Sequence, residues 1–120
     1  MNIATGTYTG NGIDNRAITG VGFAPDLVIV KGNTAQHPCF KTTSLTGDSA
    51  LDLAASGSNL SDVIQSLDSD GFTIGLNARV NSNGITYYWI AFQESVSDFQ
   101  EGSYSGNGVD NRSITGVGFQ

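Results

Sequence analysis

The chain has 120 residues, 16 of them glycine; only 13% of its residues are charged, and its net charge is −6. This length suffices for one hydrophobic core, and so few charged residues argue against long amphipathic helices. An acidic chain is a poor binder of nucleic acid, and no apolar stretch approaches the roughly 18 residues of a membrane-spanning helix. We therefore expect no nucleic-acid partner and no membrane insertion.

In chain order, short apolar segments alternate with turns of Gly, Asn, Asp and Ser, a spacing typical of all-β sandwiches. The expected strands are Thr5 to Thr9, Arg16 to Thr19, Leu27 to Lys31, Pro38 to Thr42, Ala50 to Ala54, Phe72 to Leu76 and Ile85 to Gln93. Asp62 to Leu67 is either a helical turn or a further strand, because so short a segment cannot distinguish the two periods. Seven or eight strands without a long helix predict an all-β, antiparallel β-sandwich.

The clearest strand is Ile85 to Gln93, ITYYWIAFQ, whose two sides are both apolar. One side carries Tyr87, Trp89 and Ala91, and the other carries Tyr88, Ile90 and Phe92. A strand without a polar side is expected at the centre of a sheet, covered on both faces. Leu27 to Lys31 is similarly apolar and β-branched, and we expect it to be the second core strand.

The strongest hairpin signal of the chain precedes this central strand. Asn83 and Gly84 both tolerate the positive φ that a type I′ turn requires. We expect their turn to join residues 72–80 directly to the strand that contains Trp89.

A segment near the N-terminus returns near the C-terminus. Gly6 to Phe23 reads GTYTGNGIDNRAITGVGF, and Gly102 to Phe119 reads GSYSGNGVDNRSITGVGF, with four conservative replacements. We name these segments the first copy and the second copy. Tyr8 aligns with Tyr104, so the period is 104 minus 8, or 96 residues. This period is too long for a solenoid coil and suits a whole small domain.

The repeat predicts a tandem array of domains. We expect residues 1–101 to form one β-sandwich unit and residues 102–120 to begin the next unit, as a connecting strand. A strand that adds to the sheet edge of a neighbour gains main-chain hydrogen bonds, and repeated head to tail it builds a filament. The residues expected at this contact are Gly6, Thr7, Tyr8 and Thr9 of the first copy and Gly102, Ser103, Tyr104 and Ser105 of the second copy.

A second interpretation of the repeat is a flexible string of separate domains. The short junction from Glu94 to Glu101 favours strand sharing, because it leaves little room for a free linker. If the second copy completes a sheet, deleting Gly102 to Gln120 exposes a sheet edge and lowers stability or solubility.

Three segments together carry a family resemblance: GTYTGNGIDNRAITGVGFAPDLVIVK, then LDSDGFT, then NGITYYWIAF. The chain from Gly6 to Phe92 resembles tandem repeats of phage tail proteins and large secreted bacterial surface proteins. This resemblance implies a jelly-roll, concanavalin-like sandwich and a location outside the cell or on the cell or virion surface. It implies no defined chemistry and no catalytic residue.

Catalytic groups are scarce in this sequence. The only imidazole, His37, precedes Pro38 in a polar turn, no G-x-S-x-G motif surrounds a serine, and no acid is expected to orient the ring. We expect no enzyme activity and no cofactor.

Cys39 is the only cysteine, so it is either a buried free thiol or the partner of a cysteine in another unit.

Calcium is the one ion that the sequence suggests. Asp68 and Asp70 flank a Gly turn, and Asp14 with its counterpart Asp110 lies in a second turn rich in Asn and Asp oxygens. Turn chemistry alone also explains both clusters, because Asp and Asn stabilise turns through their own backbone. These four residues are therefore weak calcium candidates.

Three basic residues suggest links between units. Arg16 and its counterpart Arg112 are expected either to pair with a carboxylate of an adjacent unit or to form a surface ion pair of little energy. Lys31 ends an apolar strand and is either a strand-end lysine or a partner in a spontaneous Lys to Asn crosslink.

The predicted function is a structural repeat module of an extracellular fibre, filament or surface protein, whose partners are copies of itself. The alternative is a carbohydrate-binding, lectin-like module of a phage tail or bacterial adhesin. In that case Tyr87, Tyr88, Trp89 and Phe92 offer rings on which a sugar could stack, although their strand is the best candidate for the core.

Overall fold

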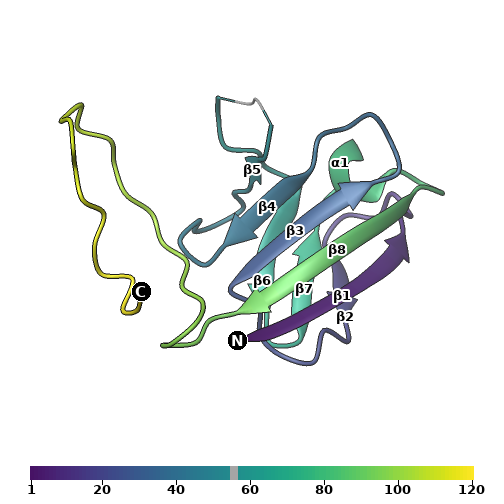
Figure 1. The fold of residues 1–120 in the computed structure, drawn as a ribbon. Helices are drawn as coiled ribbons and strands as arrows, with labels where there is room; N and C mark the ends of the chain where they lie inside the picture. Colours follow the sequence, from purple (N-terminus) through teal and green to yellow (C-terminus); the bar gives the residue numbers. More distant parts are fainter. Residues whose placement is uncertain (55–56) are drawn as a thin grey trace.

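The computed structural model describes residues 1–54 and 57–120, and it folds residues 2–93 into two antiparallel sheets (Figure 1). The five-stranded sheet has the order β1-β8-β3-β4-β5, and the three-stranded sheet has the order β2-β7-β6. The strands are β1 (Asn2–Thr9), β2 (Arg16–Thr19), β3 (Leu27–Gly32), β4 (Cys39–Thr42), β5 (Leu51–Asp52), β6 (Ile64–Asp68), β7 (Gly71–Ile74) and β8 (Thr86–Gln93). The all-β, antiparallel sandwich predicted from the sequence is confirmed.

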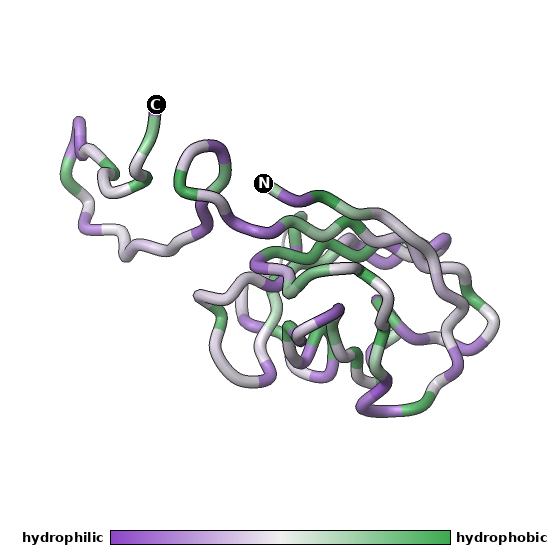
Figure 2. The backbone as a smooth tube through the Cα atoms, turned by 90° about the horizontal axis from the view of Figure 1, so that it is seen from below, coloured by the Kyte–Doolittle hydropathy of each residue, from purple (hydrophilic) through white to green (hydrophobic). Residues whose placement is uncertain are grey.

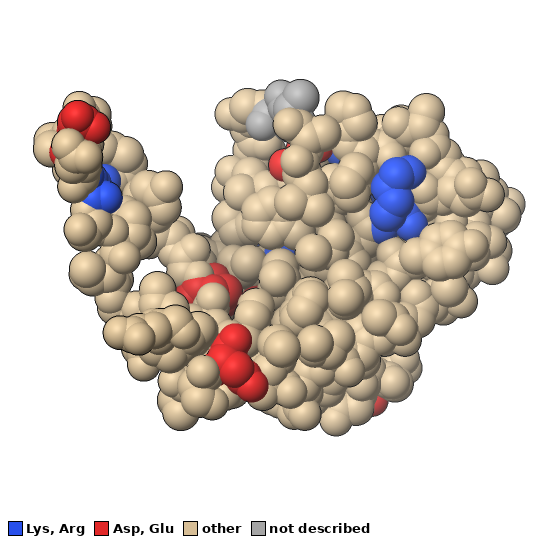
Figure 3. All heavy atoms as spheres, viewed as in Figure 1, with Lys and Arg blue, Asp and Glu red and all other residues tan. Residues whose placement is uncertain are grey.

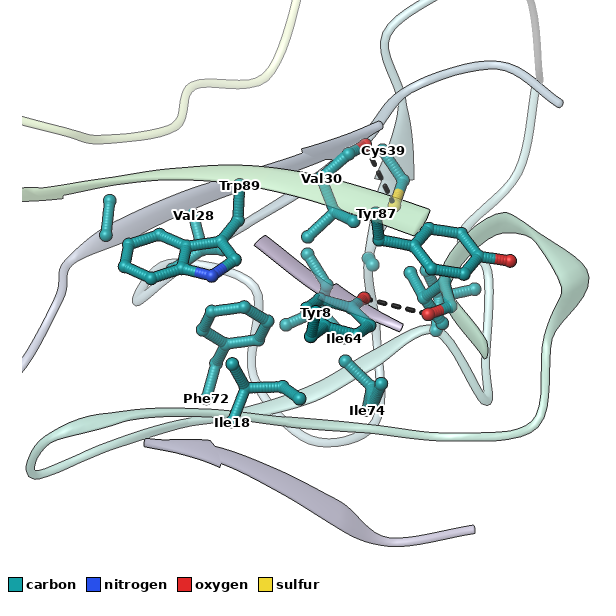
Figure 4. Close-up of a cluster of buried hydrophobic side chains, with 14 of the residues drawn as sticks. Tyr8, Ile18, Val28, Val30, Cys39, Ile64, Phe72, Ile74, Tyr87 and Trp89 are labelled. Atoms are coloured by element: carbon teal, nitrogen blue, oxygen red, sulfur yellow. Dashed lines mark hydrogen bonds between the residues drawn. The ribbon is translucent and has the colours of Figure 1, made fainter. Parts of the chain in front are cut away.

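The hydrophobic core lies between the two sheets (Figure 4). The side chains that fill it alternate along the strands, as half-buried strands require. The largest of them are fully buried: Val28, Val30, Ile64, Phe72, Ile74 and Tyr87. Trp89 of β8 meets Phe72 of β7 edge to face, with ring centroids 5.9 Å apart. This aromatic contact joins the centres of the two sheets.

Strand β8 is central, but it is not covered on both faces. It pairs with β1 on one side and with β3 on the other. The three-stranded sheet covers only the face of β8 that carries Tyr87, Trp89 and Ala91. On the opposite face Tyr88 is 53% exposed, so the prediction of two covered faces is wrong.

The predicted hairpin at Asn83 and Gly84 is also wrong. Strand β7 pairs with β2 and β6 in the other sheet, so it forms no hydrogen-bonded pair with β8. The chain crosses between the sheets through α1 (Ala78–Asn81), and Gly84, at φ +81°, reverses the chain direction so that it enters β8.

Within the described residues, no helix is long and apolar enough to cross a membrane.

Residues 62–67, whose period the sequence left open, contribute to strand β6. This strand forms a hairpin with β7 through the Asp68–Gly71 turn, where Gly71 adopts a φ of +157°. The β6–β7 hairpin therefore occupies the place that the sequence assigned to a β7–β8 hairpin.

The first copy forms one entire side of the sandwich. Strand β1 is the edge of the five-stranded sheet, β2 is the edge of the three-stranded sheet, and residues 10–15 cross between them (Figure 1). Because both strands are edges, the other strands can keep their mutual pairing without them. The first copy is thus a peripheral element that closes the core from one side.

The second copy is placed very differently. Residues 102–120 form no strand and extend away from the two sheets as an arm (Figures 1 and 2). In the space-filling view the arm projects from the body and is joined to it only at its base (Figure 3). Residues 102–120 thus complete no sheet within this chain, and their pairing with a neighbouring unit stays a prediction.

Candidate docking site of the repeated segment

The site that the sequence singles out is the surface covered by the first copy. It consists of the edges of β8 and β7 with which β1 and β2 pair, together with Asp70, Val80, Asn81 and Trp89, and we name it the acceptor surface. Within the first copy, the register along β8 runs from Gly6 opposite Trp89 to Thr9 opposite Thr86, and residues 2–5 of β1 extend the same pairing to Gln93. Along β7 it runs from Arg16 opposite Ile74 to Thr19 opposite Gly71. Main-chain pairing therefore holds the first copy at both ends.

Tyr8 is the main side chain that the first copy inserts. Its ring stacks on that of Tyr87, with centroids 5.3 Å apart, and its hydroxyl donates to the carbonyl of Val80 at 2.8 Å (Figure 4). Burial raises the pKa of Tyr8 far above its usual value. At neutral pH the phenol is therefore protonated and donates its hydrogen bond to Val80.

Asn81 binds the loop between β1 and β2. This residue is fully buried, and α1, which Asn77 caps through its side chain, positions it behind the loop. Its Oδ1 accepts from the backbone N–H of Asn11 at 3.0 Å, and its Nδ2 donates to the carbonyl of Ile13 at 2.8 Å. A second donation, to Gly75 at 2.9 Å, uses the remaining amide proton. Sequence reasoning missed Asn81, because one Asn in a four-residue helix gives no pattern.

Asp70 binds the end of the first copy. Its two carboxylate oxygens accept from the backbone N–H groups of Gly20 at 3.1 Å and Gly22 at 2.6 Å. Both glycines have positive φ, +85° and +94°, which lets both N–H groups point at one carboxylate. A predicted calcium candidate is therefore engaged in holding the first copy on the acceptor surface.

Two glycines allow the first copy to approach the acceptor surface closely. A Cβ atom at Gly6 would lie 2.4 Å from the ring of Trp89, and one at Gly10 would lie 2.1 Å from the carbonyl oxygen of Ser82. Atoms cannot approach this closely, so the surface rejects any side chain at these positions. The chain therefore needs glycine at positions 6 and 10 for packing, and at neither of them for a positive φ.

The second copy retains every residue type that the acceptor surface contacts. The counterparts are Gly102 for Gly6, Tyr104 for Tyr8, Gly106 for Gly10, Asn107 for Asn11, Ile114 for Ile18, Gly116 for Gly20, Val117 for Val21 and Gly118 for Gly22. The four replacements fall at Thr7, Thr9, Ile13 and Ala17, all of which are exposed in the first copy. The two copies thus differ only where the first copy faces solvent.

The second copy also retains the local conformation of the first. Asn111 has a φ of 54° and Asn15 one of 55°, and the backbone N–H of each donates to Oδ1 of the preceding Asp, at 2.9 and 2.8 Å. Arg112 lies 5.5 Å from the ring centroid of Tyr104, as Arg16 lies 5.3 Å from that of Tyr8. The segment therefore sets its own loop geometry before it meets any core.

The core-facing side chains of the second copy have no core to enter in this chain. Tyr104 is 67% exposed, Ile114 48% and Val117 44%. Their counterparts in the first copy, Tyr8, Ile18 and Val21, are each exposed by 9% or less. An exposed set of large apolar residues with a fixed spacing is typical of a surface that binds a partner.

The arm leaves the body from an anchored junction. The backbone N–H of Glu94 donates to Asp26 at 2.7 Å, and the carboxylate of Glu101 accepts from the hydroxyls of Thr43 at 2.5 Å and Ser44 at 2.9 Å. Burial opposes ionisation of Glu101, but these hydroxyl donors hold its pKa below the usual value. The junction is thus attached at both ends rather than free.

The remaining calcium candidates are not brought together. Asp68 accepts from the hydroxyls of Ser66 and Thr73, each at 2.8 Å, while Asp14 accepts from Gln65 at 3.1 Å. Asp110 lies on the arm, far from both. Among the described residues, no group of three or more His, Cys, Asp and Glu side chains is close enough to hold a metal ion.

His37 does have an acid beside it, contrary to the sequence expectation. Its Nδ1 lies 3.2 Å from Asp52 Oδ2, and Arg79 donates to the same oxygen at 2.7 Å. No local pattern predicts this contact, because the pairing of β5 with β4 brings Asp52 close to His37. Cys39 is fully buried nearby, and burial raises its pKa to about 12, so the thiol is unreactive at neutral pH.

The basic and aromatic candidates make contacts within their own unit. Arg16 donates to the carbonyl of Thr9 at 2.6 Å and faces Tyr8, and it forms no ion pair with the described residues of its own unit. Pairing with a carboxylate of an adjacent unit stays a prediction. Lys31 donates to the carbonyls of Gly32 and Thr34. Tyr87 and Trp89 are buried in the core, which leaves only two of the four aromatic rings with access to a sugar.

Comparisons with known proteins give one result. Residues 2–98 match a family model described as a domain of unknown function, DUF7483. The match begins at the first residue of β1 and ends at Asp98, which corresponds to Asn2 one period later. Neither the search of curated proteins nor that of solved structures found a match. The chain belongs to the DUF7483 family.

Proposed function

We propose that this chain is a structural module of an extracellular fibre or surface protein, built from tandem units that are joined through the repeated segment. In this proposal the second copy binds the acceptor surface of a neighbouring unit, with β1-like and β2-like strands on β8 and β7. The module acts by association and performs no chemistry. A strand that completes a neighbour's sheet is an established mode of protein assembly.

One observation carries the proposal: the second copy has the sequence and conformation of a docked first copy, yet it stands exposed. Tyr104, Ile114 and Val117 are between 44% and 67% exposed, and burying their apolar surface contributes about 25 cal/mol per Å², in addition to the main-chain pairing. The acceptor surface offers every complementary contact, including the Val80 carbonyl and the Asp70 carboxylate. The anchored junction supports a defined geometry between successive units over a flexible string.

The test uses an acceptor whose own first copy is obstructed. A chain of residues 1–101 with Gly10→Val should be poorly ordered, because the new side chain meets the Ser82 carbonyl. Adding a labelled peptide of residues 102–119 should give saturable binding by fluorescence anisotropy and restore the β-sheet circular dichroism.

The matched control is the same peptide with Gly106→Val, which should neither bind nor restore the sheet signal. Equal behaviour of the two peptides, or no binding by either, would rule out docking between units. The module would then be a separate domain on a string, with a second copy that serves only the domain that follows it.

A further inference from the structure

The geometry of β8 gives the second copy another place to bind, within its own chain. Strand β1 runs antiparallel to β8 and begins opposite Gln93, the last residue of β8. One period after Asn2 comes Asp98, so the same register places Asp98 opposite Gln93 and Ser105 opposite Thr86. The connection is then residues 94–97, a length common among β-hairpin loops.

The chain already reverses its direction at this point. Immediately after β8, the N–H of Ser95 donates to the carbonyl of Phe99 at 3.0 Å. The ring of Phe99 stacks on that of Phe92, with centroids 5.4 Å apart. Phe99 is the counterpart of Ile3, which is the residue opposite Phe92 in β1. One side chain of the hairpin thus lies near its expected partner while the first copy still occupies the strand position.

We infer that residues 98–119 and residues 2–23 compete for one acceptor surface, and that residues 98–119 close it as a hairpin continuing from β8 of the same chain. This inference rests on the proposed function insofar as both require the second copy to bind an acceptor surface. It adds that each copy in an array lies between two cores and can close either the one before it or the one after it.

The residues preceding each copy explain why the first copy occupies the surface here. Ala4 packs against the core, opposite Ala91, whereas its counterpart Gln100 would bring a polar amide to that position. Glu101, the counterpart of Thr5, would also have to leave the hydroxyls of Thr43 and Ser44. The bridge between Ser95 and Phe99 would have to open as well. All three changes disfavour the second copy.

Two disulfide reporters in the full chain distinguish the two occupants. Both use the Cys39→Ser background, so that no other thiol interferes. Thr86→Cys with Thr9→Cys crosslinks when the first copy is bound, because these residues are directly opposite in the register. Thr86→Cys with Ser105→Cys crosslinks only when the second copy takes the same position.

The occupancy is shifted by obstructing the first copy with Gly6→Val and Gly10→Val together, whose side chains meet Trp89 and Ser82. We expect the yield of the 86–105 crosslink in monomeric protein to increase about tenfold or more. The yield of the 86–9 crosslink should decrease. Adding Gly102→Val and Gly106→Val, the same changes in the second copy, should abolish the 86–105 crosslink.

Three results would overturn the inference. An 86–105 crosslink found only in dimers and larger species would mean that the second copy binds other chains alone, which leaves the proposed function intact. A dominant 86–9 crosslink in the obstructed chain would mean that the second copy does not compete even when favoured. An unfolded chain with neither crosslink would mean that the second copy closes no core, which would count against the proposed function too.

Discussion

At the scale of single residues, the two copies agree where the first copy contacts the core and differ where it faces solvent. Gly6, Tyr8 and Gly10 are retained as Gly102, Tyr104 and Gly106, although the second copy touches no core in this chain. A free arm has no packing reason to keep a large aromatic residue between two glycines. The retained residues therefore point to a bound state of the arm.

A tyrosine pair tests this difference of environment. Tyr8→Phe removes the buried hydroxyl that donates to Val80 at 2.8 Å and leaves that carbonyl without its donor. We expect a loss of about 1–2 kcal/mol in the free energy of unfolding, measured with urea. Tyr104→Phe, the same change on the exposed arm, should leave it unchanged. Equal effects of the two substitutions would mean that the arm is packed in solution.

The carboxylate of Asp52 on β5 contributes to stability in a way that depends on pH. Hydrogen bonds to Asp52, first from the N–H of Ala54 and then from His37, hold its pKa below the ordinary 3.8, with Arg79 adding to the effect. The unfolded chain therefore binds this proton more readily than the folded one. Stability is kept above the ordinary pKa and is lost as the pH falls through the lower, folded-state pKa.

Asp52→Asn should accordingly flatten the acid end of the stability profile, measured by urea unfolding between about pH 2 and 7. Asp110→Asn on the arm, whose carboxylate contacts only the adjacent backbone, is the matched control and should keep the acid dependence of the parent chain. If Asp52→Asn also keeps that dependence, other carboxylates control the acid transition.

At the scale of elements, the sequence predicts the strands well and their partners less well. Short runs of apolar, aromatic and β-branched residues identified β8 and β3 as the core strands, because such runs are typical of buried strands. The hairpin prediction failed because Asn83 and Gly84 report only a local turn, while β7 is held by long-range pairing with β2 and β6. Asn81 and Asp70 reach the first copy from far along the chain, so no local signal reveals their roles.

The loop after β4 depends on one buried lysine. Nζ of Lys41 donates to the carbonyls of Leu45, Gly47 and Ser49, each at 2.7 Å. Lys41→Met leaves three carbonyls without a donor, and we expect it to lower the free energy of unfolding by about 2–3 kcal/mol.

The matched control for this loop is Lys31→Met. Lys31 also donates to carbonyls, but it is exposed at the end of β3, so we expect a change within about 0.5 kcal/mol. Urea unfolding of both variants measures the difference. Similar small changes in the two would show that the loop finds other donors, such as water, for its carbonyls.

At the scale of the whole molecule, the chain contains one core, the first copy that closes it, and a second copy of nearly the same sequence. The first copy closes the sandwich on one side by forming the edges of both sheets, and the second copy leaves from an anchored junction at the end of β8. The period of 96 residues and the family match to residues 2–98 describe a unit of the same size. The sequence could predict this unit and its duplicated opening, whereas the acceptor surface required the folded sheets.

Hydrogen exchange of the second copy in the full chain tests most directly whether it can replace the first copy. With the first copy intact, the amides of residues 103–105 and 112–115 should exchange at rates near those of an unfolded peptide. With Gly6→Val and Gly10→Val they should become protected, and adding Gly106→Val should remove that protection. Unprotected amides in all three proteins would contradict the account, since the second copy would then have no affinity for the surface that its sequence matches.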